Sequence, residues 1–254
     1  MSATGARAAV SVERLSKSFG DRLVLRGLDL TVQPGESLTI IGHNGSGKTT
    51  LIRILAGLAR PTEGVVRIYG ARQGPNAVAA QRAVGVVSHH TFLYPDLTPV
   101  ENLSFYGHLY DVPDLNRRIE ASLERFALTG YRRDPVRALS RGTQQRLSIA
   151  RALLPDPPLV LLDEPDSGLD PQSIALLPHL LAMAGLEQRT TILTTHNLEL
   201  GLALAQRIAV LARGRLAWEH ATAGLTVADL RDAYYANLPK AIRDALAATQ
   251  GERH

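Results

Sequence analysis

The chain has 254 residues, of which 45% are hydrophobic and 20% are charged, and its formal net charge is +4. This is an ordinary globular composition, long enough for a large core in one domain or two. Cysteine is absent, which excludes disulfides and thiolate metal sites, and no dense Lys/Arg run marks a nucleic-acid patch. We therefore expect no nucleic-acid partner.

The sequence contains no predicted membrane span. Residues 1–10 lack the apolar core of a signal peptide, and the longest mostly apolar stretch, Ile174–Leu186, is too short and contains Pro178 and His179. We expect that the chain does not cross a membrane alone. If it works at a membrane, a partner supplies the spans.

The first third of the chain predicts a small antiparallel sheet followed by a buried strand and a helix. Val10–Leu15 and Leu23–Val32 alternate between apolar and polar residues, as half-buried strands do. Ser37–Ile41 is a short apolar strand, and Thr50–Leu58 has the periodicity of an amphipathic helix. The residues between them decide the interpretation of the whole chain.

These residues fit the phosphate-binding pattern Gly-x-x-x-x-Gly-Lys-[Ser/Thr]. The pattern and the next residue are Gly42, His43, Asn44, Gly45, Ser46, Gly47, Lys48, Thr49 and Thr50. Glycines let the backbone form a concave nest whose N–H groups point at one anion. Lys48 brings a charge to the β- and γ-phosphates, and the Thr49 hydroxyl is suited to Mg²⁺. The following helix directs its positive end at the phosphates.

Further strands follow, with a helical region between two of them. Val65–Gly70 and Val84–Val87 are predicted strands, whereas the stretch from Leu97 to about Leu154 has no strand signal. We expect a helical subdomain at about residues 91–155, inserted between parallel strands. Its predicted helices are Val100–Leu109, Leu115–Leu128 and Gln144–Leu154.

An acidic pair follows the continuous apolar strand Pro158–Leu162. The carboxyl ends of parallel strands form the ligand-binding edge of such sheets. We therefore expect Asp163 to hold Mg²⁺, directly or through water, and Glu164 to polarise the attacking water. His196, after the strand Thr190–Thr194, lies where a contact to the γ-phosphate is predicted.

The C-terminal part predicts a hairpin, from Ile208–Leu211 to Arg215–Trp218, and then helix beyond about Thr226 with an interruption at Pro239. The predicted organisation is a nucleotide-binding domain over residues 1–225 and a helical tail over 226–254. The expected fold class is α/β: a P-loop NTPase (RecA-like) core with a parallel sheet, an N-terminal antiparallel β subdomain and the inserted helical subdomain.

Five motifs in order resemble the ATP-binding cassette family. They are the phosphate loop, Leu139–Arg146, which is similar to the family's signature motif, Leu161–Pro165, Ser167–Asp170 and His196. The resemblance runs from about Val10 to about Gly224. It implies an ATPase that uses ATP and Mg²⁺, works with an integral membrane permease, and is found at the cytoplasmic face of the cell membrane.

The resemblance also implies roles for particular residues and a second copy of the chain. Phe19 corresponds to the aromatic residue that stacks on adenine. The family forms a head-to-tail dimer, in which the nucleotide lies between the phosphate loop of one copy and the signature motif of the other. Ser140, Arg141 and Gly142, with Asp170, are therefore expected to contact nucleotide.

Two departures from the family pattern stand out. Arg141-Gly142-Thr143 replaces the usual Gly-Gly-Gln, which puts the strength of dimer closure in question while keeping the Ser140 hydroxyl and Gly142. His89 occupies the position of a Gln that touches Mg²⁺ and the attacking water. Imidazole still hydrogen-bonds water, so we expect a tolerated replacement with catalytic and metal-site contacts.

The context of His89 and of residues 97–103 resembles, less specifically, the ATPases of the haem exporter of cytochrome c maturation. A general drug, lipid or polysaccharide exporter remains the alternative. A soluble ribosome- or DNA-associated cassette ATPase is disfavoured, because such proteins usually carry two cassettes or long coiled coils. A small-molecule kinase leaves the signature motif unexplained.

Overall fold

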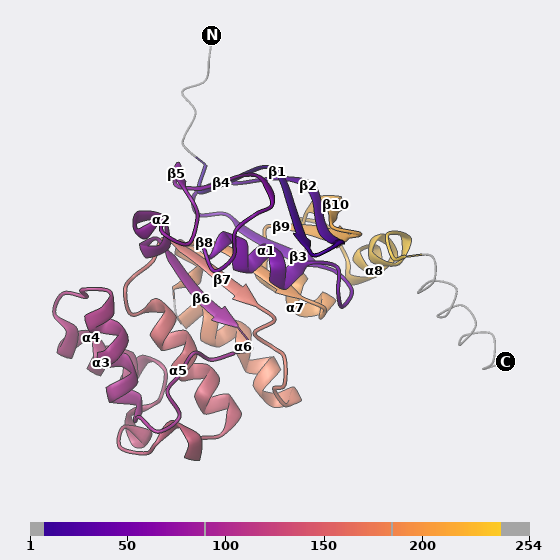
Figure 1. Ribbon diagram of the computed structural model, residues 1–254. Coiled ribbons are helices and arrows are strands. Elements are labelled where there is room, and N and C mark those ends of the chain that lie inside the picture. The colour runs from indigo at the N-terminus through magenta and orange to yellow at the C-terminus, as the bar shows by residue number, and fades with distance from the viewer. Residues whose placement is uncertain (1–7, 89, 184, 240–254) are drawn as a thin grey trace, which may run out of the picture.

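The computed structural model describes residues 8–88, 90–183 and 185–239. The first of its two sheets is antiparallel (Figure 1). The strand order is β2-β1-β4-β5. The bounds are β1 Val10–Phe19, β2 Arg22–Val32, β4 Glu63–Ile68 and β5 Ala71–Arg72. Val10 is paired with both Val32 and Ile68, so β1 lies between β2 and β4. This is the predicted N-terminal antiparallel subdomain.

The second sheet has the order β10-β9-β3-β8-β7-β6, in which β10 alone is antiparallel to its neighbour. The bounds are β3 Ser37–Ile41, β6 Val84–Ser88, β7 Leu159–Asp163, β8 Thr190–Thr195, β9 Arg207–Ala212 and β10 Arg215–Ala221. All five residues of β7 are buried, and the first four, Leu159–Leu162, are the apolar run expected of a central parallel strand. The parallel register aligns the carboxyl ends of β3, β7 and β8 at one edge.

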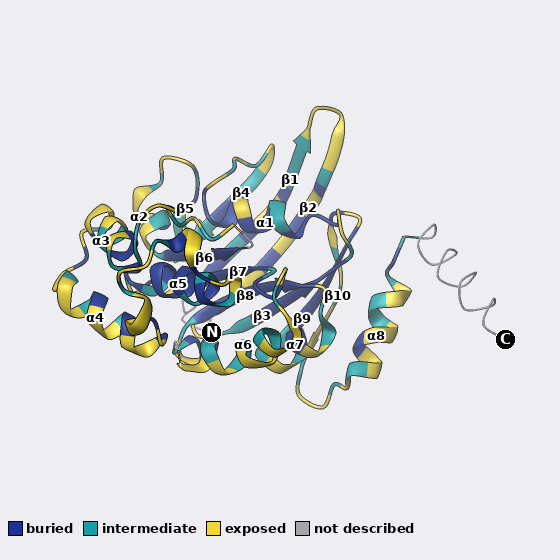
Figure 2. Ribbon diagram, turned by 90° about the horizontal axis from the view of Figure 1, so that it is seen from below, coloured by how far each residue is buried: buried dark blue, intermediate teal, exposed yellow. Residues whose placement is uncertain are grey.

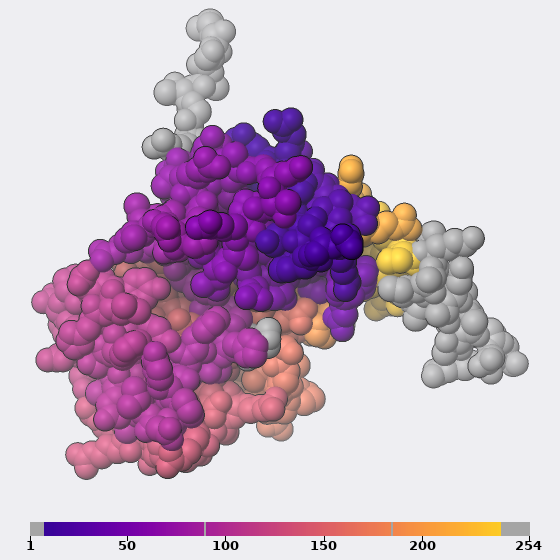
Figure 3. Space-filling view, in the orientation of Figure 1, coloured from indigo at the N-terminus to yellow at the C-terminus, as the bar shows by residue number. Residues whose placement is uncertain are grey.

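The predicted helical subdomain is present between β6 and β7, and the expected fold class is confirmed. It contains α3 Pro99–Leu109, α4 Leu115–Arg125 and α5 Arg141–Leu153, with short 3₁₀ turns at Thr129–Tyr131 and Val136–Ala138. In Figure 3 its magenta-to-pink surface forms a lobe next to the indigo-to-purple N-terminal part.

The interior divides into apolar clusters that hold the layers together. One packs α1 (Lys48–Leu55) between the two sheets, and another packs α5 against the opposite face of the parallel sheet. Figure 2 shows the buried strands and α5 enclosed by helices with exposed outer faces. Burial on both faces fixes the parallel strands, and the loops at their carboxyl ends are positioned by them.

Several predicted boundaries were wrong for reasons of backbone geometry. The strand expected to reach Gly70 ends at Ile68, because Tyr69 and Gly70 have φ of 45° and 78°. The helix expected to reach Leu128 ends at Arg125, since Ala127 has φ of 50°. Further helical elements are α2 Val78–Arg82, α6 Pro171–Met183, α7 Leu198–Leu204 and the 3₁₀ turn Leu186–Gln188.

The C-terminal helix α8 (Val227–Ala236) begins with a capping box, in which Thr226 and Asp229 bond each other's backbone N–H. Its Leu230 is fully buried with Ile208 and Val210 of β9. The rest of the predicted tail, residues 240–254, lies outside the described residues. Over the part of the chain that is described, no helix is long and apolar enough to cross a membrane.

Candidate functional site

The phosphate loop joins the carboxyl end of β3 to the start of α1. Gly45 and Gly47 have φ of 80° and 112°, in the region that favours glycine. A Cβ on Gly42 would lie 2.6 Å from the Leu211 carbonyl oxygen and 2.6 Å from the Ser46 hydroxyl. The loop therefore depends on glycine both for its turns and for its close approach to β9.

Lys48 is held at the mouth of this loop. Its side chain is 4% exposed, and Nζ donates to the Gly42 carbonyl at 2.7 Å and the His43 carbonyl at 3.4 Å. Nζ also lies 3.1 Å from Oε1 of Glu164. A buried ammonium needs such partners. The two residues predicted for phosphate binding and for water activation are thus in direct contact.

Oxygen groups suited to Mg²⁺ meet beside this pair. The Thr49 hydroxyl donates to Oδ1 of Asp163 at 3.3 Å, and the Thr194 hydroxyl donates to the same oxygen at 2.7 Å. Mg²⁺ prefers oxygen ligands and usually keeps several waters, with only one or two protein groups. Thr49 and Asp163 fit that chemistry. Within the described residues no group of three or more His, Cys, Asp or Glu side chains is assembled as a metal site.

Glu164 has an unusual backbone conformation, with φ of 48°. Such strain in a non-glycine residue persists where the surroundings enforce it and is common at functional sites. Here the Glu164 N–H donates to the Thr194 carbonyl at 2.9 Å, and the Glu164 carbonyl accepts from Ser167 N–H at 3.0 Å. The carboxylate is directed toward Lys48 as a result.

Lys48, Thr49 and Glu164 line a cleft of about 570 Å³ together with the predicted adenine-stacking residue. Phe19, at the end of β1, is 55% exposed, and Nζ of Lys17 lies 4.9 Å from the centre of its ring. The cleft is lined by Phe19, Arg22, Val24, Asn44, Gly45, Gly47, Lys48, Thr49, Thr50 and Glu164. A nucleotide fits this set, because an exposed aromatic ring and an N–H-rich loop lie on the same cleft.

Other residues of the phosphate loop lie behind this surface. Gly42, His43 and Ser46 are not among the lining residues. The His43 imidazole Nδ1 lies 2.7 Å from the Asn44 carbonyl, and the Ser46 hydroxyl is buried with no hydrogen-bond partner among the described residues. The nucleotide contacts predicted for these three residues remain predictions.

The predicted signature residues form a second group. Ser140 caps α5 by accepting from Thr143 N–H at 3.2 Å. The Arg141 guanidinium lies against the loop 167–170, since a Cβ on Gly168 would be 2.7 Å from its Nη1. A Cβ on Gly142 would lie 3.2 Å from the Ser173 hydroxyl.

Asp170 completes this group at the start of α6. Its carboxylate accepts from the backbone N–H and hydroxyl of Ser173, which lowers the pKa of Asp170. Neither Asp170 nor Ser140, Arg141 or Gly142 lines the phosphate-loop cleft. Within one copy, the structure does not bring the two predicted nucleotide-binding groups together.

The two predicted histidines remain predictions. His196 is exposed and follows Thr195 at the edge that carries Asp163, but it does not line the cleft. His89 lies outside the described residues.

Two buried polar contacts were missed by the sequence reasoning. The Thr195 hydroxyl donates to both carboxylate oxygens of Asp166, at 3.1 and 3.0 Å, and Gln145 Nε2 donates to the Pro165 carbonyl at 3.1 Å. These contacts fix the loop after Glu164 to β8 and α5. Asp166 lies in the sequence between the motifs Leu161–Pro165 and Ser167–Asp170 and belongs to neither. Its position between them was the only sequence signal that pointed to it.

Arg151 of α5 was also missed. Burial lowers its pKa, and its guanidinium donates to the Val86 carbonyl at 2.6 Å while lying over the rings of Phe92 and Tyr106. This cation connects the middle of β6, the segment after that strand and α3. Its position on the buried face of an amphipathic helix was the signal that could have found it.

Known proteins resemble this chain in sequence and in fold. The ABC transporter family matches residues 25–167. The Nod factor export ATP-binding protein I of Paraburkholderia xenovorans is 36% identical over 94% of this chain and 81% of its own length. That of Ralstonia nicotianae is 37% identical over 83% of this chain and 66% of its own length, just under two thirds. A dimeric ATP-binding cassette in a post-hydrolysis state, bound to ADP and phosphate, superposes with a TM-score of 0.75 at 27% identity, covering 84% and 98% of the two chains.

Proposed function

The chain belongs to the ABC transporter family of ATPases, which use ATP with Mg²⁺, and from this premise we propose that it powers a membrane exporter through a separate permease. The observation that supports catalysis most directly is the contact of Lys48 with Glu164 at the mouth of the phosphate loop. ATP with Mg²⁺ supplies the phosphoanhydride bond and a cation that neutralises its charge.

Each residue of the site has a proposed task. Lys48 and the N–H groups of the loop bind the β- and γ-phosphates, while Thr49 and Asp163 hold Mg²⁺. Glu164 orients the attacking water and accepts its proton. In this proposal His196 contacts the γ-phosphate. His89 lies outside the described residues and keeps the task that the family resemblance implies, a contact to Mg²⁺ and to the attacking water. Catalysis by this set is positioning and charge stabilisation.

A second copy of the chain completes the site in this proposal. Ser140, Arg141, Gly142 and Asp170 do not line the cleft of their own copy. A head-to-tail dimer presents them to the nucleotide of the partner copy, and ATP favours closure because both surfaces contact it only when the dimer is closed. The related cassette bound to ADP and phosphate is dimeric, which supports this arrangement.

An exposed aromatic surface on α3 and the segment before it is suited to the permease. Phe105 and Leu109 of α3 are 43% and 61% exposed, and Tyr94 packs against Phe105 with ring centres 4.9 Å apart. A contiguous exposed apolar patch marks an interaction site. We place the chain at the cytoplasmic face of the cell membrane through this contact. Residues 1–225 form the nucleotide-binding domain in this proposal, and 226–254 the tail.

The cargo is the finer part of the proposal. The names of the relatives, which refer to Nod factor export, favour an exporter of drug, lipid or polysaccharide type over the haem exporter of cytochrome c maturation. The haem role is the second candidate, carried by the sequence context of His89.

The test is affinity capture from native membranes with the Glu164→Gln variant and ATP. Loss of the carboxylate keeps nucleotide bound while lowering turnover about 100-fold or more, so the closed, partner-bound state accumulates. The matched control is Glu199→Gln, an exposed residue of α7. Mass spectrometry identifies the partners.

The outcomes separate the alternatives. A multi-span permease recovered with Glu164→Gln supports the exporter, and haem- or cytochrome c-assembly subunits select the haem role. Recovery of ribosomal or nucleic-acid proteins alone refutes the transporter. Wild-type turnover in Glu164→Gln refutes the role of that carboxylate.

A further inference from the structure

A cleft of about 820 Å³ lies at the opposite end of the parallel sheet from the phosphate loop. Pro34 and Gly35 precede β3, Pro158 precedes β7, and Thr190 begins β8, and all of them line it. The cleft therefore opens at the amino ends of these strands. No residue lines both this cleft and the phosphate-loop cleft.

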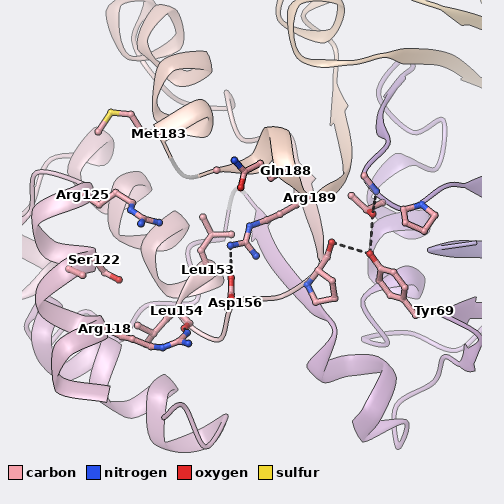
Figure 4. A pocket seen from close by; sticks show the side chains of 16 residues that line it. Tyr69, Arg118, Ser122, Arg125, Leu153, Leu154, Asp156, Met183, Gln188 and Arg189 are labelled. Carbon is pink, nitrogen blue, oxygen red and sulfur yellow. Dashed lines mark hydrogen bonds and ion pairs between the residues drawn. The ribbon is translucent and has the colours of Figure 1, made fainter. Parts of the chain in front are cut away.

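Three arginines converge on this space (Figure 4). Arg118 and Arg125 are seven residues apart on α4, which places them on one face of that helix. Arg189, directly before β8, extends toward them from the opposite wall. The one acidic residue among those lining the cleft is Asp156, whose Oδ1 lies 2.5 Å from Nη2 of Arg189. Positive charge is thus in excess.

Two of the arginines donate to backbone carbonyls, and of the three only Arg189 is ion-paired with a described residue. Arg189 Nη1 donates to the Pro157 carbonyl at 2.7 Å, and Arg118 Nη1 donates to the Leu154 carbonyl at 3.3 Å. Nε of Arg189 is buried and has no acceptor among the described residues. Arg125 makes no ion pair with any described residue. A buried donor without an acceptor is normally satisfied by water or a bound ion.

We propose that this cleft binds a small phosphorylated organic anion, separately from the nucleotide site. Guanidinium groups on fixed supports match the geometry of phosphate oxygens, often with two hydrogen bonds each. The volume lies in the range of small-molecule sites. Leu153, Leu154 and Met183 supply apolar surface for the body of the ligand.

The ligand would contact two parts of the fold at once. Arg118 and Arg125 belong to the helical subdomain, whereas Arg189 is fixed to the start of β8 in the core. A ligand that bridges them stabilises the arrangement in which the three guanidiniums converge. The size of this stabilisation is set by how much more tightly the ligand binds that arrangement than any other. The site thus gives the chain a way to sense an anion independently of ATP.

The test uses inorganic pyrophosphate as the probe and the full chain carrying Lys48→Ala, which weakens phosphate binding at the nucleotide loop. Isothermal titration calorimetry is expected to show one remaining site. Arg125→Gln weakens it about tenfold, the discrimination expected from one lost charge-assisted pair. Arg118→Gln has a similar effect.

The matched control is Arg117→Gln. Arg117 lies on the same helix but bonds Asp114 and does not line the cleft, so its loss leaves pyrophosphate affinity unchanged. Arg125 is exposed and unpaired among the described residues, so Arg125→Gln is expected to fold, as circular dichroism will verify. The proposal is overturned if the Lys48→Ala chain binds no pyrophosphate or if Arg125→Gln binds it as tightly as its parent.

A phospholipid headgroup carries the same chemistry, so a second arm uses vesicles containing phosphatidic acid. The recessed cleft predicts binding of free pyrophosphate without arginine-dependent vesicle binding. Arginine-dependent binding of vesicles but not of pyrophosphate overturns the small-molecule assignment. ATP hydrolysis by the wild-type chain reports on the proposed ATPase function separately, so the two can fail independently.

Discussion

The two ends of the parallel sheet differ in how their charged side chains are balanced: those at the carboxyl ends are paired, whereas positive charge is in excess at the amino ends. At the carboxyl ends, Lys48 and Glu164 contact each other, and Asp163 accepts from two threonine hydroxyls. At the amino ends, Arg118 and Arg125 meet Arg189 with one carboxylate among the lining residues. The first arrangement comes mainly from two short motifs, whereas the second exists only because distant segments fold together. A sequence pattern predicts the first kind of site, but it cannot predict the second, whose residues are far apart in the sequence.

The largest effect expected at the carboxyl end follows from Lys48→Ala. The variant loses the ammonium that bonds the loop carbonyls and the carboxylate of Glu164, so we expect ATP turnover to fall about 100-fold or more. Phosphate release measures it. Arg53→Ala, an exposed change on the same helix, serves as the control and keeps its turnover. If the two variants hydrolyse ATP equally well, Lys48 has no special part in turnover, and the carboxyl end of the sheet is not the catalytic end.

Glycine substitutions at the two ends of the sheet are expected to lower the free energy of unfolding by different amounts. In Gly42→Ala the new Cβ meets the Leu211 carbonyl at 2.6 Å, and we expect the free energy of unfolding to fall by about 1–3 kcal/mol. Gly35→Ala at the amino end has open space and only its φ of 77° to oppose it, so about 1 kcal/mol is expected. Urea unfolding compares the two. A larger loss for Gly35→Ala would contradict the packing argument.

The smallest effect concerns Asp170, which lies at the start of α6 and lines neither of the two clefts. The Ser173 N–H is the main cause of the lowered pKa of Asp170, and the Ser173 hydroxyl adds to it. Ser173→Ala therefore raises this pKa part of the way to its ordinary value, as an NMR titration of the carboxyl carbon will show. An unchanged pKa would contradict the hydroxyl's part.

The sign of the accompanying stability effect follows. A carboxyl whose pKa is lower in the folded chain stabilises the fold above its unfolded pKa, and this contribution is lost as the pH falls through the folded value. Ser173→Ala reduces the contribution at neutral pH, so its stability depends less on pH in the acid range.

Sequence reasoning recovered the main strands of both sheets and the phosphate loop, because alternation, apolar runs and glycine spacing are local signals, but it did not predict the order of the strands within a sheet. It failed where the signal was tertiary. The positive φ at Tyr69 and Ala127 shortened two elements, and α7 is too short to show a clear period.

The site divides in the same way. Lys48, Thr49, Asp163 and Glu164 were named from motifs, and the structure brings Lys48 to Glu164 and Thr49 to Asp163. Asp166 and Arg151 had no motif of their own. Their importance is a matter of burial and of partners more than 25 residues away in the sequence, Thr195 and Val86. No local pattern encodes such a partner.

The position of β3 within its sheet also determines when this strand can pair during synthesis of the chain. The strand that carries the phosphate loop is flanked by β8 and β9, with Ser37 opposite Thr191 and Leu38 opposite Arg207. Both neighbours are made long after β3 during synthesis, so the growing chain holds an unpaired apolar strand until most of it has emerged. Such non-local pairing slows folding and leaves a strand edge open to other chains. The nucleotide site, which depends on that strand, is therefore among the last features that the nascent protein completes.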